Sequence, residues 1–205
     1  MNDTELQSWF ESVRNTLETA YLAAVEPWRQ SGFSGPAERW EACRRPIADC
    51  AGADGTFLDI GCANGYLLEC LLRWTGERGV RIEPWGLDLS DKLVALARKR
   101  LPAFGENLLV GNGLFWRPPR RFDYVRTELC YVPDEYRQAY VTRLLKEVVA
   151  PGGRLLVAEY RSRRDDSSRP WVDEDLGNAG SRVETTRSGF WEGKELTRVA
   201  VVRVV

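Results

Sequence analysis

The 205-residue sequence contains no histidine and only one methionine. Imidazole is the commonest general base and a common metal ligand, so its absence excludes Ser–His and Cys–His nucleophile pairs. The five cysteines are an odd number, and no two have a short spacing such as C-x-x-C. Disulfides and structural zinc are therefore not expected, and we predict no metal site.

The sequence also lacks an excess of charge and a long apolar segment. Its 29 basic and 30 acidic residues give a formal net charge of -1, so no overall field attracts nucleic acid or an anionic membrane. No apolar run approaches the roughly 20 residues of a membrane span, and no basic segment leads into one. We expect a cytoplasmic protein with a small-molecule partner, without nucleic acid or membrane partners; a homodimer stays open.

The first fifty residues have the pattern of a helical cap. Apolar residues spaced by three and four predict amphipathic helices over 5–30 and 38–47, with a loop over 31–36 between them. Pro27 interrupts the first helix. Trp28 and Phe33 flank this break, and we predict that they form a lid over a bound ligand.

Residues 51–205 have the pattern of a single domain in which strands alternate with helices. Apolar runs predict strands over 56–60, 85–89, 108–110, 122–125 and 154–159. Two β-like runs follow, 181–187 and 195–205, with a hairpin loop over 188–194. The expected fold class is α/β: a mostly parallel, doubly wound, Rossmann-like sheet with a C-terminal antiparallel hairpin strand and the N-terminal helical cap.

The first predicted strand ends in a glycine-rich turn, residues 59–65, with the sequence DIGCANG. Gly61 allows a tight turn without a Cβ clash, and Gly65 lets the following helix approach strand and ligand. About 25 residues later, Asp88 at the tip of the next strand offers a carboxylate to two ribose hydroxyls. Together these features predict a nucleoside site, although close packing of the turn would account for its glycines as well.

The turn resembles the first motif of the class I S-adenosylmethionine-dependent methyltransferases, and the resemblance covers roughly residues 54–160. Ala63 replaces the middle glycine of that motif. The resemblance implies that Asp59 and the turn from Gly61 through Cys62 and Ala63 to Gly65 hold the methionine part of S-adenosylmethionine. The alternative cofactor NAD needs the spacing G-x-G-x-x-G for its pyrophosphate, and the chain lacks it.

The resemblance also assigns the nucleoside end of the cofactor. Asp88 would bind the ribose hydroxyls, and Leu89 would flank adenine. Asn112 and Gly113 follow the third strand, where the family often has Asp and a small residue beside the adenine amino group. The carbonyl oxygen of an Asn side chain can still accept from that group.

The segment 126–133, after the fourth strand, is where the family has residues that face both methionine and the methyl acceptor. Glu128 is the first candidate for orienting or deprotonating the acceptor, and Tyr131 is the second. A solvated acid and a packing tyrosine are the alternatives. Glu159, at the tip of the fifth strand, is a further carboxylate predicted at the same edge of the sheet.

The sequence thus predicts an enzyme that transfers a methyl group from S-adenosylmethionine and releases S-adenosylhomocysteine. We expect an O or N atom of a small molecule as acceptor, such as an aromatic natural-product intermediate, because aromatic residues in the cap and loops suit a planar partner. They are Trp28, Phe33, Trp40, Trp116, Trp171 and Trp191. The alternatives are a methyltransferase of RNA or protein, and a catalytically silent scaffold with the same fold.

Overall fold

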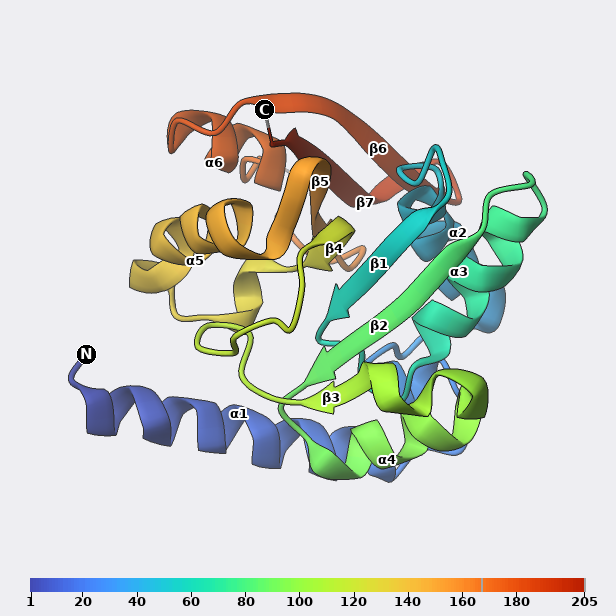
Figure 1. Cartoon of the computed structure of the whole chain (residues 1–205), viewed down its shortest axis with the longest axis horizontal. Helices are drawn as coiled ribbons and strands as arrows, with labels where there is room; N and C mark the ends of the chain where they lie inside the picture. The colour runs from blue at the N-terminus through green and yellow to red at the C-terminus, as the bar shows by residue number, and fades with distance from the viewer. Residues whose placement is uncertain (167, 205) are drawn as a thin grey trace.

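The computed structural model describes residues 1–166 and 168–204 (Figure 1). The predicted run 195–205 therefore ends on a residue outside the described part, and Ser167 of the charged loop after the fifth strand lies outside it too.

Seven strands form one sheet in the described chain, in the order β3-β2-β1-β4-β5-β7-β6. β1 to β5 pair with one another in parallel, and β7 is antiparallel to both β5 and β6. This arrangement confirms the predicted fold class. The strands are β1 Gly55–Ile60, β2 Ile82–Asp88, β3 Leu108–Val110, β4 Phe122–Thr127, β5 Val149–Tyr160, β6 Val183–Trp191 and β7 Lys194–Arg203.

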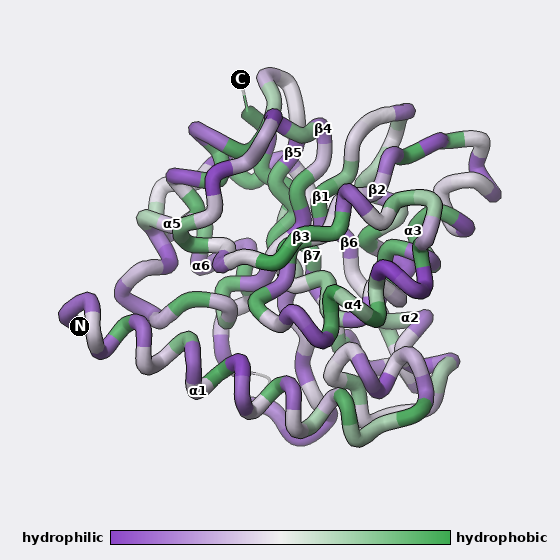
Figure 2. The backbone as a smooth tube through the Cα atoms, turned by 60° about the horizontal axis from the view of Figure 1, so that its bottom comes forward, coloured by the Kyte–Doolittle hydropathy of each residue, from purple (hydrophilic) through white to green (hydrophobic). Residues whose placement is uncertain are grey.

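Helices cover both faces of the sheet (Figure 1). They are α1 Asp3–Leu22, α2 Ala37–Ala48, α3 Tyr66–Gly76, α4 Asp91–Arg100, α5 Arg137–Arg143 and α6 Val172–Asn178. Alternate strand residues face opposite layers: Leu156 and Ala158 pack with α2, α3 and α4, whereas Leu155 and Val157 pack with α5, α6 and the start of α1. The apolar strands consequently fill the middle of the molecule, and polar segments alternate along the outer helices (Figure 2).

The two helices predicted for the cap have different surroundings. α2 belongs to one of the covering layers, where it packs against β6, β7 and α3 and buries Trp40 and Ile47. α1 lies instead along the edge where the arrowheads of β1 and β2 end (Figure 1). The boundary at residue 50 between a cap and a core stays a prediction.

Several predicted boundaries are wrong for identifiable reasons. α1 ends at Leu22 rather than near residue 30, and a short 3-10 turn, Arg29–Ser31, follows. The hairpin loop is two residues rather than seven, because Glu192 and Gly193 adopt φ values of 48° and 77°, as a type I′ turn requires. The two glycines in the segment suggested a longer loop, and α6, after the charged loop, was not predicted.

Candidate active site

The carboxyl ends of β1, β2 and β4 border a cavity of about 310 Å³, which we call the donor cavity. α1 and the loop after it cover the cavity from outside. This edge of a doubly wound sheet is where ligands bind. Its lining residues are Val13, Leu17, Tyr21, Ser31, Gly32, Arg44, Ile60, Gly61, Ala63, Leu87, Asp88, Leu89, Gly111, Asn112, Gly113, Glu128, Cys130, Tyr131 and Tyr160.

The glycine-rich turn needs small residues for two separate reasons. Gly61 has a φ of 80°, and a Cβ on it would lie 2.5 Å from the ring of Tyr131. Gly65 has a φ of 74° at the start of α3, where a Cβ would lie 3.0 Å from that of Ala97. Ala63 holds a left-handed φ of 45° without being glycine, a form of backbone strain that is concentrated at binding sites.

Asp88 is buried at the tip of β2 and fastens the turn to the cavity wall. Its Oδ2 accepts from the Ala63 N–H at 2.8 Å, and its Oδ1 accepts from the Ser90 N–H at 2.9 Å. Burial raises the pKa of this carboxyl, while the backbone hydrogen bonds oppose the shift. Each oxygen keeps a lone pair, so the group can still accept from two vicinal hydroxyls in the donor cavity.

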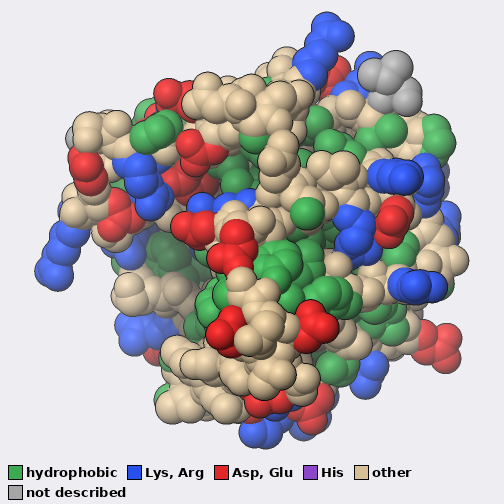
Figure 3. All heavy atoms as spheres, turned by 90° about the vertical axis from the view of Figure 1, so that its left-hand side faces the viewer, with side chains coloured by type: hydrophobic (Ala, Val, Ile, Leu, Met, Phe, Trp, Pro, Cys, Tyr) green, Lys and Arg blue, Asp and Glu red, His purple; other side chains and the backbone are tan. Residues whose placement is uncertain are grey.

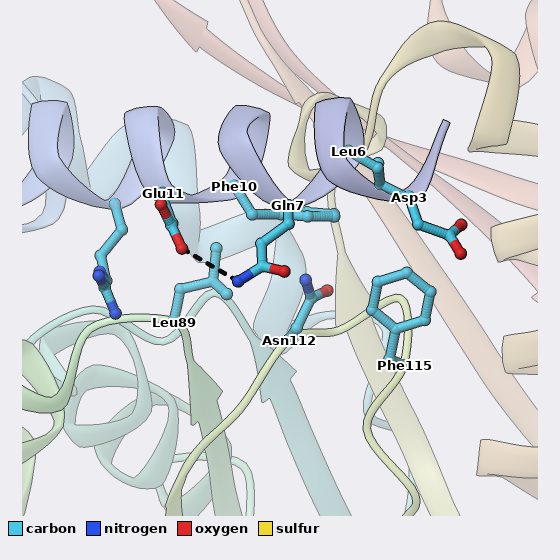
Figure 4. A pocket seen from close by; sticks show the side chains of 9 residues that line it. Asp3, Leu6, Gln7, Phe10, Glu11, Leu89, Asn112 and Phe115 are labelled. Atoms are coloured by element: carbon cyan, nitrogen blue, oxygen red, sulfur yellow. Dashed lines mark hydrogen bonds between the residues drawn. The ribbon is translucent and has the colours of Figure 1, made fainter. Parts of the chain in front are cut away.

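On the same side of the donor cavity as Asp88, Leu89 and Asn112 also line a second, more open cavity of about 520 Å³ beneath α1. Figure 4 shows the Asn112 side chain pointing toward α1, beside Phe115. Its Oδ1 already accepts from the Leu114 N–H at 2.9 Å. Asn112 therefore offers its Nδ2 as a donor, together with the remaining lone pair of Oδ1, where the sequence suggested only an acceptor.

Three residues predicted to bind the cofactor do not line the donor cavity. The Cys62 side chain is buried in the core, next to the Cα of Gly86. Gly65 packs against α4, and the Asp59 carboxylate lies behind the wall. These residues shape the turn from behind, which sequence spacing could not distinguish from contact with the ligand.

The group behind the wall is Arg126, a buried arginine that the sequence analysis missed. It is the penultimate residue of β4, and 3% of its side chain is exposed. Nη1 donates to Asp59 Oδ1 and to the Tyr131 hydroxyl, each at 3.0 Å. Nη2 donates to Glu128 and, at 3.1 Å, to the Tyr160 hydroxyl. One guanidinium thus holds two carboxylates and two phenols at the edge of the donor cavity.

The pairing of Arg126 with Asp59 had a signal in the sequence. Arg126 interrupts an apolar strand, and a charged residue there needs a partner of opposite charge. Asp59 occupies the equivalent place in the neighbouring strand, and the register pairs the two residues directly. Burial raises the pKa of Asp59 to about 6, although the positive charge of Arg126 acts in the opposite direction.

Glu128 and Tyr131, the predicted catalytic residues, both line the donor cavity and contact each other. The Tyr131 hydroxyl donates to Glu128 Oε1 at 2.6 Å, and the Cys130 thiol lies 3.5 Å from Oε2. Burial raises the pKa of Tyr131 well above its ordinary value, so the phenol stays protonated. Tyr131 can therefore orient Glu128, and of the two side chains only the carboxylate is suited to accept a proton.

The residues predicted as a lid do not reach the donor cavity. The Trp28 indole N–H donates to the Gly35 carbonyl at 3.1 Å, and the Phe33 ring lies under the Arg39 guanidinium, 4.7 Å from ring centroid to Cζ. The same loop reaches the cavity through Ser31 and Gly32 instead. Gly32 has a φ of 85°, and its Cα lies so close to the Tyr21 hydroxyl that no larger residue would fit at this position.

A buried amide fastens this loop to the glycine-rich turn. Asn64 Nδ2 donates to the Pro27 carbonyl at 3.0 Å and to Gln30 Oε1 at 3.1 Å. The covering loop and the turn beneath it are thus held together before any ligand enters.

Glu159 lies beyond the donor cavity, in a smaller cavity of about 240 Å³ that we call the acceptor cavity. It accepts from Arg161 at 2.9 Å, from Arg169 at 2.6 Å and from the Val172 N–H at 2.8 Å. These bonds make it a structural carboxylate. The two cavities share three lining residues, Glu128, Cys130 and Tyr160.

Comparison with known proteins identifies the class. Residues 57–153 match the family described as a methyltransferase domain. This segment is a methyltransferase domain, which bears out the predicted family and enzyme class, and its fold is that of the class I, S-adenosylmethionine-dependent methyltransferases. No curated protein matches the sequence. Within the described residues no helix is long and apolar enough to cross a membrane, and no cluster of three or more His, Cys, Asp or Glu could hold a metal.

Solved structures with the same fold are distant in sequence. Magnesium protoporphyrin IX methyltransferase from Synechocystis PCC 6803, crystallised with bound S-adenosylmethionine, is 16% identical with a TM-score of 0.64, over 96% of this chain and 97% of that one. The mitomycin 7-O-methyltransferase MmcR is 19% identical with a TM-score of 0.57, over 87% and 60%. The glycopeptide N-methyltransferase MtfA is 17% identical with a TM-score of 0.60, over 79% and 94%.

Proposed function

We propose that this methyltransferase acts on an O or N atom of a small molecule bound in the acceptor cavity. The observation that supports it is the shared wall: Glu128, Cys130 and Tyr160 face both cavities. A cofactor in the donor cavity, with its ribose on Asp88 and its methionine part beyond the glycine-rich turn, would direct its sulfonium methyl toward this wall. As the composition suggests, we propose the cytoplasm as the compartment.

The size and surface of the site favour a small acceptor over RNA or protein. The acceptor cavity, at about 240 Å³, is below the roughly 300–1,000 Å³ typical of pockets for drug-sized ligands. On the face shown in Figure 3, Lys and Arg are scattered among acidic side chains, and no continuous basic surface is visible there. Structures of both an O- and an N-methyltransferase share the fold, so the fold accommodates either acceptor atom.

The reaction needs alignment and, for a weakly acidic acceptor, a base. Bound S-adenosylmethionine would supply a sulfonium methyl group to a lone pair of the acceptor, and the electrons of the broken carbon–sulfur bond would return to sulfur, leaving a neutral thioether. Glu128 accepts the proton that the acceptor O–H or N–H loses. Arg126 and the Tyr131 hydroxyl hold its Oε1, which leaves Oε2 beside the Cys130 thiol for the acceptor. Positioning supplies much of the remaining rate.

Replacing Glu128 with glutamine is expected to lower kcat by about 100-fold, within the range of general-base catalysis, and to change the affinity for S-adenosylhomocysteine less than about 2-fold. The acceptor is first found by transfer of labelled methyl from S-adenosylmethionine to panels of phenols, alcohols and amines. Glu106→Gln, at an exposed position in the turn after α4, is the matched control. Full turnover by Glu128→Gln would remove Glu128 as the base. Methylation of RNA or protein alone would refute the small-molecule proposal.

A further inference from the structure

One arginine in the donor cavity lacks a partner within the described chain. Arg44, on α2, lines the cavity beside Ser31, Gly32 and Tyr160. Its Nη1 is buried and makes no hydrogen bond, and no carboxylate of the described residues lies within ion-pair distance of it. Its Cζ lies 3.3 Å from the centroid of the Tyr160 ring, so the guanidinium is stacked on an aromatic face.

An arrangement of this kind is unfavourable unless an anion completes it. A buried guanidinium N–H without an acceptor loses its hydration, and the face of an aromatic ring compensates only part of the loss. Arg126, the other arginine at this edge, shows the contrast because it has both carboxylate and phenol partners. The guanidinium of Arg44, which lines the cavity without an acceptor for its N–H groups, is therefore available to a negatively charged group of a ligand.

The order of groups along the cavity identifies that negative group. The strand order β3-β2-β1-β4-β5 sets this sequence of groups: Asn112 follows β3 and Asp88 ends β2 at the side suited to a nucleoside, and the turn at Gly61 and Ala63 follows β1. Arg44 lies at the opposite side, over the ring of Tyr160 at the end of β5. S-adenosylmethionine carries one carboxylate, on its methionine part, at the opposite end of the molecule from adenine.

We propose that Arg44 binds the carboxylate of the cofactor and thereby selects methyl donors that retain this group. The inference rests on the proposed use of the donor cavity and deepens it. Because Tyr160 lies under the Arg44 guanidinium and also lines the acceptor cavity, the same contact would fix one wall of that cavity when the cofactor is bound.

Titration calorimetry with two ligands tests the proposal. S-adenosylhomocysteine carries the carboxylate; its decarboxylated analogue keeps adenine, ribose, sulfur and the amino group. Arg44→Met retains an apolar stem over Tyr160 and removes the charge, and Arg44→Lys retains the charge without the planar fork. Arg45→Met is the matched control, since Arg45 is the next residue of α2 and pairs on the surface with Glu41 and Glu77.

We expect Arg44→Met to weaken S-adenosylhomocysteine binding by about 10- to 100-fold, as for a lost charge-assisted hydrogen bond, and to leave the analogue within about 2-fold. Arg44→Lys should fall between Arg44→Met and the parent. Equal losses for both ligands, or no loss for either, would overturn the carboxylate role. Binding of the analogue by Arg44→Met also shows that the variant is folded. If the parent protein binds neither ligand, the use of the donor cavity itself is refuted, and the role of Arg44 with it.

Discussion

Replacing Arg126 with methionine is expected to lower the free energy of unfolding by about 3–5 kcal/mol, the loss typical of a buried ion pair that loses one partner. The side chains of Arg126 and Asp59 are 3% and 1% exposed. Removing the guanidinium would leave the carboxylates of Asp59 and Glu128 without their counterion. The hydroxyls of Tyr131 and Tyr160 would each lose a hydrogen-bond donor. The methionine side chain has a length similar to that of arginine, so the substitution leaves little empty space that would itself destabilise the protein.

Chemical denaturation of the parent and of Arg126→Met measures this difference. The double variant Asp59→Asn with Arg126→Met should recover part of the loss, because it removes one of the two carboxylates that the single variant leaves unpaired. The pKa of Asp59 is raised in the folded state, so the contribution of this group to stability decreases as pH rises through about 6. A loss below about 1 kcal/mol would show that the network does not depend on Arg126.

Replacing Asp88 with alanine is expected to weaken S-adenosylhomocysteine binding by about 100-fold or more. A carboxylate that accepts from two ribose hydroxyls contributes about 1.5–3 kcal/mol for each hydrogen bond. The same change also leaves the N–H groups of Ala63 and Ser90 without their acceptors, which loosens the left-handed turn at Ala63.

Isothermal titration separates these two contributions. Asp88→Asn keeps acceptor capacity for one backbone N–H and should bind more tightly than Asp88→Ala but less tightly than the parent. Asp91→Ala, at an exposed position in the first turn of α4, is the control and should bind as the parent does. Parent-like affinity in Asp88→Ala would place the ribose elsewhere.

The fold could be predicted from the sequence because its determinants are local. Short apolar runs separated by helical periodicity predicted the five parallel strands, and β3 was predicted with its observed bounds, Leu108–Val110. The hairpin was predicted with too long a loop because a segment with two glycines can be either strand or turn. Only the positive φ of Glu192 and Gly193 shows that the strands continue to a two-residue turn.

The candidate site was predictable where it depends on strand tips. Asp88 lies at the tip of a predicted strand, Asn112 and Glu128 follow two others, and the carboxyl ends of parallel strands meet at one edge. Arg44, Ser31 and Tyr21 could not be predicted, because their presence in the cavity depends on how α1, its following loop and α2 pack over the sheet.

The same limitation explains why the predicted lid residues do not line the donor cavity. Trp28 and Phe33 are large and close to Pro27, but large aromatic side chains pack against the protein as readily as against a ligand. The close contact of Gly32 with Tyr21 turns the small residues of that loop toward the cavity.

Titration of the purified parent protein with S-adenosylhomocysteine tests most directly whether the donor cavity binds the cofactor. We predict saturable binding of one molecule for each chain, and no binding of NAD under the same conditions, since the turn lacks the glycine spacing for a pyrophosphate. Absence of heat with S-adenosylhomocysteine, confirmed by an unchanged melting temperature in its presence, would contradict the assignment of this cavity.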